Sequence, residues 1–231
     1  RKTAVNDSLK NYLKGMITDF IFPALELQEY SAAAAIEVWG VLKIFHFEDR
    51  SALYRKWFEN THMPERPQQL KDAFARAEKD IKEVTQHLNA STKDTVDARL
   101  LAKVTHSHPL LVDRLIGWIE SYDNFVPLLV DAMRHLSSLT FDVCSSFIAR
   151  RFVSPEKKLI SSSGLGNPMW MSNLSSFTGQ LFKKYAGIEI HGILHMITQS
   201  LNEGGDATSR VILLRELLVQ MGGITLIEEA N

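Results

Sequence analysis

Two histidines four residues apart are the pair in this sequence that most resembles a metal site. They are His191 and His195 in the segment HGILH, and a spacing of four places two imidazole rings on one side of a helix. In the zinc-protease form of this motif a glutamate general base directly follows the first histidine. Here that position is Gly192, and no third ligand stands nearby. We therefore expect no metal at this pair.

The single cysteine, Cys144, is the next residue with nucleophilic potential, and His135 is the base that it could use. Cys144 lies between Val143 and Phe147 on an apolar helical face, a position that favours a buried and unreactive thiol. No carboxylate pair is tied by its spacing to a nucleophile or a base. The sequence thus predicts no catalytic residue, no cofactor, no small-molecule substrate and no enzymatic activity.

Basic residues gather near the ends of two predicted helices. They are Arg150, Arg151, Lys157, Lys158, Lys183 and Lys184. A cluster of this kind suits contacts with phosphate groups, and hence with RNA. Lysine and arginine are also favoured near helix C-termini by the helix dipole and by solubility alone. Both interpretations stay open from the sequence.

The composition excludes several classes of protein. The chain has 231 residues, 45% of them hydrophobic, and 26 Lys and Arg against 27 Asp and Glu give a net charge of −1. This balance indicates a folded globular chain and argues against a surface that binds nucleic acid throughout. The longest apolar stretch, residues 31–47, is interrupted by charged residues, so we expect no membrane span. The chain starts at Arg1 without a leader, and we expect it to be an intracellular piece of a longer protein.

The clearest helix is predicted between Leu70 and Leu88. Apolar residues recur there every three or four positions, at Leu70, Phe74, Ala77, Ile81, Val84 and Leu88. This spacing forms one stripe along a helix. Acid–base pairs four residues apart cover the other face, and they are Asp72 with Arg76, Glu78 with Lys82, and Lys79 with Glu83. The segment is therefore expected to be a helix with one buried and one solvated face.

The same periodicity runs through most of the chain, and no segment alternates for long enough to be a strand. Expected N-caps are Ser107, Asp123 or Asn124, and Thr140, and a late apolar stripe comprises Ile190, Leu194, Ile197 and Leu201. We expect an all-α fold of about ten helices, stacked as antiparallel pairs in a HEAT-like solenoid. Residues 1–231 are expected to form a single domain, with a surface loop at 153–168 between two helical halves.

Several long segments of the chain resemble the THO complex subunit 2 family, the large scaffold subunit of the THO/TREX complex. The resemblance is collinear from about residue 19 to the C-terminus. The segments are EVWGVLKIFHFEDRSALYRKW (residues 37–57), THSHPLLVDRLIGWIESYDN (105–124), VDAMRHLSSLTFDV (130–143), KKYAGIEIHGILHMITQSL (183–201) and LLRELLVQMGGI (213–224).

The resemblance implies a non-catalytic helical scaffold in a nuclear complex for messenger RNA processing, transport and export. It implies a fold similar to the middle domain of eukaryotic initiation factor 4 gamma. The implied partners are other THO complex subunits and a DEAD-box ATPase of the export helicase family. The alternative is an RNA-contacting solenoid that uses the basic residues.

Partner contacts would come from interhelix loops and helix ends along one edge of the stack. The residues singled out for such contacts are Glu65, Arg66, Tyr122, Asp123, Asn124, Arg150 and Arg151. Possible RNA or phosphate contacts are Arg150, Arg151, Lys157, Lys158, Lys183 and Lys184. Each position also has a purely structural interpretation, because residues 64–67 can serve as a spacer and Asp123 or Asn124 as a helix cap.

Overall fold

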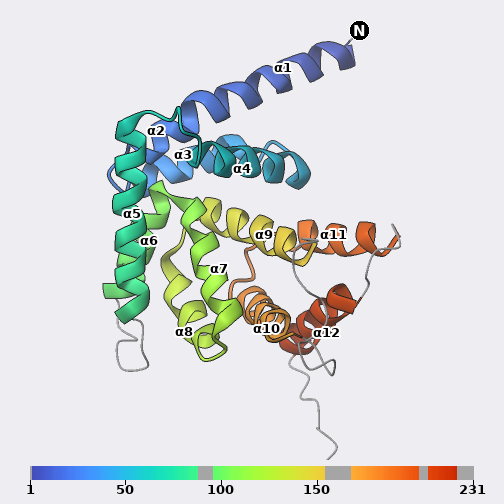
Figure 1. Ribbon diagram of the computed structural model, residues 1–231. Helices are drawn as coiled ribbons and strands as arrows, with labels where there is room; N and C mark the ends of the chain where they lie inside the picture. Colours follow the sequence, from blue (N-terminus) through green and yellow to red (C-terminus); the bar gives the residue numbers. More distant parts are fainter. Residues whose placement is uncertain (1, 88–95, 154–167, 203–207, 223–231) are drawn as a thin grey trace, which may run out of the picture.

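The protein is described by a computed structural model over residues 2–87, 96–153, 168–202 and 208–222 (Figure 1). Within these ranges every regular element is helical, so the predicted all-α class is confirmed. The first half of the chain forms α1 (Lys2–Met16), a π-helical turn (Ile17–Ile21), α2 (Phe22–Glu26), α3 (Ala32–Leu42), α4 (Phe47–Thr61), α5 (Gln68–His87) and α6 (Val96–Ser107). The second half forms α7 (Val112–Ser121), α8 (Phe125–Ala132), α9 (Ser138–Val153), α10 (Met169–Lys184), α11 (His191–Asn202) and α12 (Thr208–Gly222). Short 3₁₀ turns, Pro109–Leu111 and Met133–His135, precede α7 and follow α8.

Helix α5 follows its predicted apolar stripe. Leu70, Ala77, Ile81 and Val84 are buried and belong to the side that packs inward, while Leu88 lies outside the described residues. The charged face differs from the expectation, because none of the three expected acid–base pairs occurs among the described residues. Glu78 instead pairs with Arg114 of α7 at 2.6 Å, and Asp72 accepts a hydrogen bond from the Gln68 amide at 2.7 Å. The stripe thus fixes how α5 packs, whereas its ion pairing depends on a neighbouring helix.

Two of the predicted helix caps are wrong. Ser107 ends α6, because the helical hydrogen-bond ladder continues to His108, whose N–H donates to the Val104 carbonyl at 3.0 Å. The cap of α9 is Ser137, whose hydroxyl accepts from the Thr140 N–H at 3.2 Å, so Thr140 lies in the first turn. Helix α8 begins directly after Asn124, as predicted.

Helix α9 is the centre of the molecule. In Figure 1 it lies beneath α4, beside α11, and above α10 and α12, while α5 and α6 form the left edge of the molecule in this view. Its side chains are buried almost all the way round, including those of Thr140, Asp142, Ser145 and Ser146. Buried polar groups generally need partners inside the protein, and other segments supply them for three of these four: Thr105 for Thr140, Arg50 for Asp142 and Ser51 for Ser146. The Ser145 hydroxyl has no hydrogen-bond partner among the described residues. The solenoid-like stacking of helices is confirmed.

Helices α10 and α12 approach each other closely. A Cβ atom at Gly179 of α10 would lie 2.7 Å from Cγ of Gln220 in α12. A glycine there lets the two backbones come together. In the part of the chain that the structure describes, no helix is both long and apolar enough to cross a membrane. The predicted loop at 153–168 lies outside the described residues except for its two ends.

Candidate interaction groove

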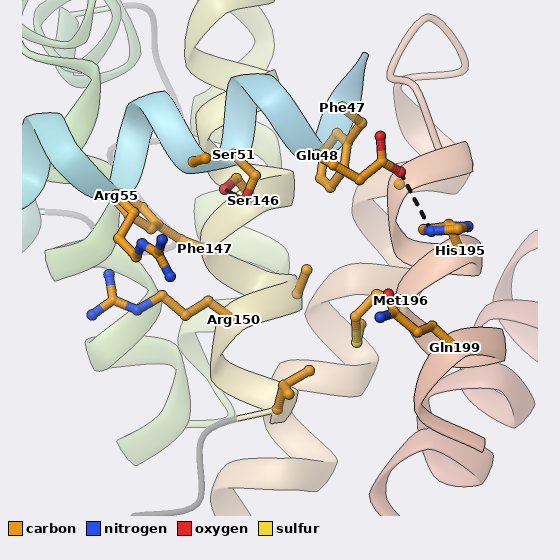
Figure 2. Close-up of a pocket in the computed structure, with 14 residues that line it drawn as sticks. Phe47, Glu48, Ser51, Arg55, Ser146, Phe147, Arg150, His195, Met196 and Gln199 are labelled. Carbon is orange, nitrogen blue, oxygen red and sulfur yellow. Dashed lines mark hydrogen bonds and ion pairs between the residues drawn. The ribbon is translucent and has the colours of Figure 1, made fainter. Parts of the chain in front are cut away.

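A groove lies between α4, α9 and α11 (Figure 2). Its volume is about 290 Å³, the size of a pocket that takes one or two side chains. The walls are partly apolar, with Phe47 from α4, Phe147 from α9 and Met196 from α11. Helices supply these walls, so the side chains around the groove stand on rigid elements.

Two arginines stand at one end of this groove. Arg55 comes from α4 and Arg150 from the last turn of α9, and Figure 2 shows both guanidinium groups at the same end. The Arg55 side chain is 65% exposed, with Glu59 at 4.0 Å. Arg150 is also exposed, and its guanidinium carbon lies 5.4 Å from the centre of the Phe58 ring. Guanidinium groups bind carboxylates and phosphates in two-pronged geometry, so this end of the groove suits an anionic group.

The other end of the groove is lined by α11. There His195 Nε2 lies 3.5 Å from Glu48 Oε1, and Met196 and Gln199 follow along the same helix. Helix α11 comes close to α4 because Gly192 has no side chain. A Cβ atom at Gly192 would lie far inside van der Waals distance of three atoms of the Phe47 ring.

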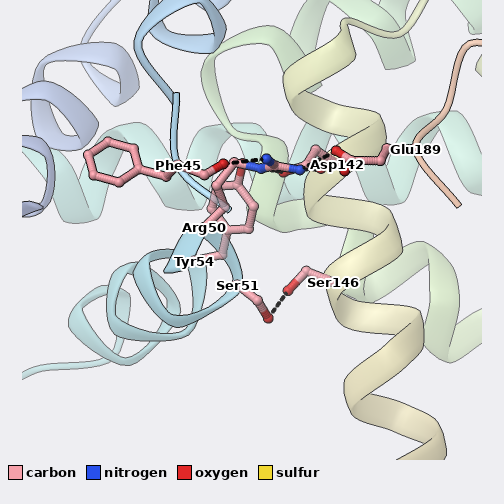
Figure 3. Close-up of polar contacts among 7 residues, drawn as sticks. All are labelled: Phe45, Arg50, Ser51, Tyr54, Asp142, Ser146 and Glu189. Atoms are coloured by element: carbon pink, nitrogen blue, oxygen red, sulfur yellow. Dashed lines mark hydrogen bonds and ion pairs between the residues drawn. The ribbon is translucent and has the colours of Figure 1, made fainter. Parts of the chain in front are cut away.

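A buried polar cluster holds α4 against α9 next to the groove (Figure 3). Arg50 of α4 donates to both carboxylate oxygens of Asp142, at 2.8 and 2.9 Å, and each side chain is only 4% exposed. Arg50 also donates to the Phe45 carbonyl at 2.7 Å and to Glu189 at 2.6 Å. Tyr54 donates to Asp142 at 2.7 Å. Four of the five N–H donors of Arg50 are therefore used within the protein.

The electrostatics of this cluster follow from burial. Desolvation and the Asp142 charge raise the pKa of Tyr54 well above its ordinary value, so the phenol stays protonated. Burial lowers the pKa of Arg50, but the hydrogen bonds and charges of Asp142 and Glu189 more than offset this and raise it overall. Beside the cluster, the hydroxyls of Ser51 and Ser146 lie 2.7 Å apart. These contacts fix the distance between α4 and α9.

The predicted contact residues before α5 divide between surface and interior. Glu65 is exposed, as a contact residue would be. Arg66 instead turns inward to a salt bridge with Glu26, and these side chains are 7% and 2% exposed. Trp57 also donates its indole N–H to Glu26. The Arg66 guanidinium is thus engaged in the core.

The turn between α7 and α8 is at the surface. Tyr122 is 57% exposed, and Asp123 and Asn124 are exposed beside it. The Asp123 carboxylate accepts the Asn124 N–H at 2.7 Å, a local bond typical of a helix start.

The predicted basic residues do not form one patch. Arg151 pairs with Asp113 at 2.6 Å and with Glu120 at 2.9 Å, so its charge is neutralised locally. Lys183 is exposed, and Lys184 pairs with Asp131. Helices α9 and α10 run antiparallel, because Phe152 contacts Trp170 at one end and Phe141 contacts Tyr185 at the other. Arg150 and Lys183 are therefore at opposite ends of this pair. Lys157 and Lys158 lie outside the described residues.

Cys144 takes the buried position that the sequence suggested, and the histidine pair lies on the exposed side of α11. The rings of His191 and His195 stack with centroids 6.2 Å apart. No cluster of three or more His, Cys, Asp or Glu residues that could hold a metal ion occurs among the described residues. Cys144 is fully buried, and desolvation raises the pKa of its thiol.

Sequence reasoning missed most of the groove. Arg55, Met196 and Gln199 lie on walls assembled from α4 and α11, and no local motif marks them. The sequence does single out Arg150 as a contact candidate and His195 as part of a histidine pair. Gly192 stands out as a glycine inside a predicted helix, which often has a packing reason.

The chain is similar to one family along most of its length. Residues 2–97 match the family described as THO complex subunit 2 N-terminus, and residues 101–175 match the family described as Transcription- and export-related complex subunit. THO complex subunit 2 of Homo sapiens is 31% identical over 220 residues, which is 92% of this chain and 13% of that protein. The proteins of the same name from Saccharomyces cerevisiae and Arabidopsis thaliana are 28% and 27% identical, over 93% and 88% of this chain and 13% and 11% of their own lengths. The chain thus spans about an eighth of the length of these relatives.

Proposed function

The chain belongs to the THO complex subunit 2 family, and on this premise we propose that it is a non-catalytic scaffold segment of a THO complex. The complex would act in the nucleus, in messenger RNA processing and export. Its partners would be other THO complex subunits and a DEAD-box ATPase of the export helicase family.

The α4–α9–α11 groove is the observation that carries the docking proposal. It combines apolar walls with Arg55 and Arg150, two exposed cations on a rigid platform. A protein surface with an acidic side chain beside an apolar one would complement it. We propose that such a surface on the ATPase docks here.

Docking would act on the ATPase through differential affinity. A DEAD-box ATPase changes between open and closed arrangements of two lobes, and a scaffold shifts this equilibrium only as far as it binds one arrangement more tightly. No catalytic group of the scaffold is needed for this effect. Glu65 and the exposed residues Tyr122, Asp123 and Asn124 are proposed as further contacts, outside the groove.

A binding experiment tests this function directly. The chain is mixed with the ATPase without RNA, and binding and ATP turnover are measured. Changing Arg55→Glu and Arg150→Glu together is expected to raise Kd at least about tenfold, equivalent to about 1.4 kcal/mol. The matched control changes Lys10→Glu and Lys183→Glu, two exposed lysines away from the groove. Equal weakening by both double variants, or no complex at about 50 μM, would refute the proposal.

The alternative function is RNA contact by the same end of the groove. Arg150 lies in the last turn of α9, and the sequence directly after that helix contains Lys157 and Lys158. Neutralising phosphates with these cations would make RNA affinity fall steeply with salt.

The RNA test uses Arg55→Glu, Arg150→Glu, Lys157→Glu and Lys158→Glu together. Arg151 is left unchanged, because a glutamate there would face Asp113 and Glu120 and destabilise the fold. If RNA contact is the function, this variant loses RNA binding and its salt dependence flattens. Unchanged RNA binding would exclude the alternative.

A further inference from the structure

A second groove lies between α5 and α7, at the other edge of the molecule from α11 (Figure 1). Its volume is about 480 Å³, against about 290 Å³ for the α4–α9–α11 groove. Its base is apolar and consists of Ile81 from α5 with Leu115 and Trp118 from α7. A space of this size with an apolar base is typical of a ligand or peptide site.

Positive charge lines the rim of this groove. Lys79 and Lys82 stand on α5 and Arg114 on α7, and all three are exposed. The one carboxylate on the rim, Glu78, already pairs with Arg114 at 2.6 Å. Lys79 and Lys82 make no ion pair with another described residue. The rim therefore carries an excess of two positive charges in a chain whose net charge is −1.

The chemistry of the base favours a protein segment over RNA. Binding of single-stranded RNA uses aromatic faces on which bases stack. Trp118 is the one aromatic ring among the residues that line this groove, so it offers no series of faces on which successive bases could stack. Its ring packs edge-on against Phe125, with the ring centres 6.0 Å apart. Ile81 and Leu115 are aliphatic, and they suit an apolar side chain.

We propose that the α5–α7 groove is a docking site for an acidic amphipathic segment of another protein. An apolar residue of the segment lies on the Trp118 ring, and its carboxylates pair with Lys79, Lys82 and Arg114. This is the helix-in-groove mode of recognition, in which apolar anchors give affinity and flanking charges give orientation. The site is independent of the α4–α9–α11 groove.

The test uses a synthetic peptide and fluorescence anisotropy. The labelled peptide has about 15 residues, with Leu on one helical face and Glu on its flanks. We expect a Kd on the order of 10 μM for the whole chain. A matched peptide with Lys in place of Glu is expected to bind at least about tenfold more weakly.

Two variants locate the binding. Changing Lys79→Glu and Lys82→Glu together is expected to weaken binding at least about tenfold. Ala75→Trp adds no charge and fills the groove from an exposed position, and it is expected to abolish binding. The control Lys10→Glu with Lys183→Glu is expected to bind like the unchanged chain, as is the Arg55→Glu, Arg150→Glu variant, which separates this site from the proposed ATPase site.

Several outcomes would overturn the proposal. One is failure of the acidic peptide to bind, and a second is equal binding of the Lys-containing peptide. A third is unchanged binding by both groove variants when circular dichroism shows that they are folded. Binding of oligouridine that depends on Lys79 and Lys82, without competition from the peptide, would assign the groove to RNA instead.

Discussion

The charged residues of this chain have two different roles, and exposure separates them. Arg50, Arg66 and Arg151 are engaged with carboxylates of their own chain. Arg55 and Arg150 are exposed at the end of a groove. The charge of an arginine that is already paired with a carboxylate of its own chain is largely compensated, so such a residue attracts an anionic partner less. Among these five arginines, Arg55 and Arg150 are therefore the ones best placed to bind another molecule.

His108 is the residue whose protonation should affect stability most clearly. It is 3% exposed, neither of its ring nitrogens has a hydrogen-bond partner among the described residues, and its ring centre is 6.2 Å from that of Phe74. Burial, with help from the charges of Arg66 and Arg76, lowers the pKa of His108 to about 4, from 6.5. The native state therefore holds a neutral ring over a range in which the unfolded chain binds a proton.

The sign of the pH effect follows from this difference. Between pH 6.5 and 4 the unfolded state binds more protons, so the free energy of unfolding falls as the pH falls. The loss attributable to His108 is about 3 kcal/mol over this range. In urea denaturation at a series of pH values, His108→Leu is expected to show a flatter acid limb than the unchanged chain. The control His191→Asn, at an exposed position, should retain the full slope, and an unaltered slope in His108→Leu would contradict the assignment.

Among the helices, the contact between α4 and α11 depends on one missing side chain. A methyl group at Gly192 would overlap the Phe47 ring. Gly192→Ala is expected to destabilise the protein by about 1–3 kcal/mol, because the ring or helix α11 must move. Thermal and urea unfolding measure this loss.

The control for this prediction is another helical glycine. A Cβ atom at Gly40 of α3 would meet no atom within 4 Å, so Gly40→Ala should stabilise by up to about 1 kcal/mol through helix propensity. Adding Phe47→Leu to Gly192→Ala should recover part of the loss. Additive losses in that double variant would show that the two residues do not interact.

Periodicity located the helices well but did not always give their orientation. Helix α11 buries Ile193 and Ile197, while Leu194 and Leu201 are 38% and 40% exposed. Of the predicted stripe residues Leu194, Ile197 and Leu201, only Ile197 is therefore buried. A helix with apolar residues on more than one side has several possible faces. The close approach at Gly192 decides which of them packs inward.

Across the whole molecule, the Arg50–Asp142 cluster joins segments that are remote in sequence. Arg50 donates hydrogen bonds to Asp142, 92 positions away in the sequence, and to Glu189, 139 positions away. It therefore connects α4, α9 and the segment before α11. We expect the native state to unfold as one cooperative unit around this cluster.

Removing one charge of the pair tests this connection. Asp142→Asn leaves the Arg50 charge buried and poorly compensated, and is expected to cost about 3–5 kcal/mol in urea denaturation. Asp49→Asn breaks the more exposed pair with Lys14, in which the Lys14 and Asp49 side chains are 29% and 35% exposed, and should cost less than about 1 kcal/mol. Equal losses in the two variants would mean that the buried cluster has no special role.

Local spacing and long collinear segments are enough to establish the helical class, the stripe of α5, the buried state of Cys144 and the family. Which arginines face solvent, why Gly192 is needed and where two grooves open became visible only in the folded chain. These features depend on contacts between residues that are far apart in the sequence. Arg150 and Arg151 are neighbours in sequence, yet one is exposed and the other is paired with Asp113 and Glu120, because only packing sets which side of α9 each of them occupies.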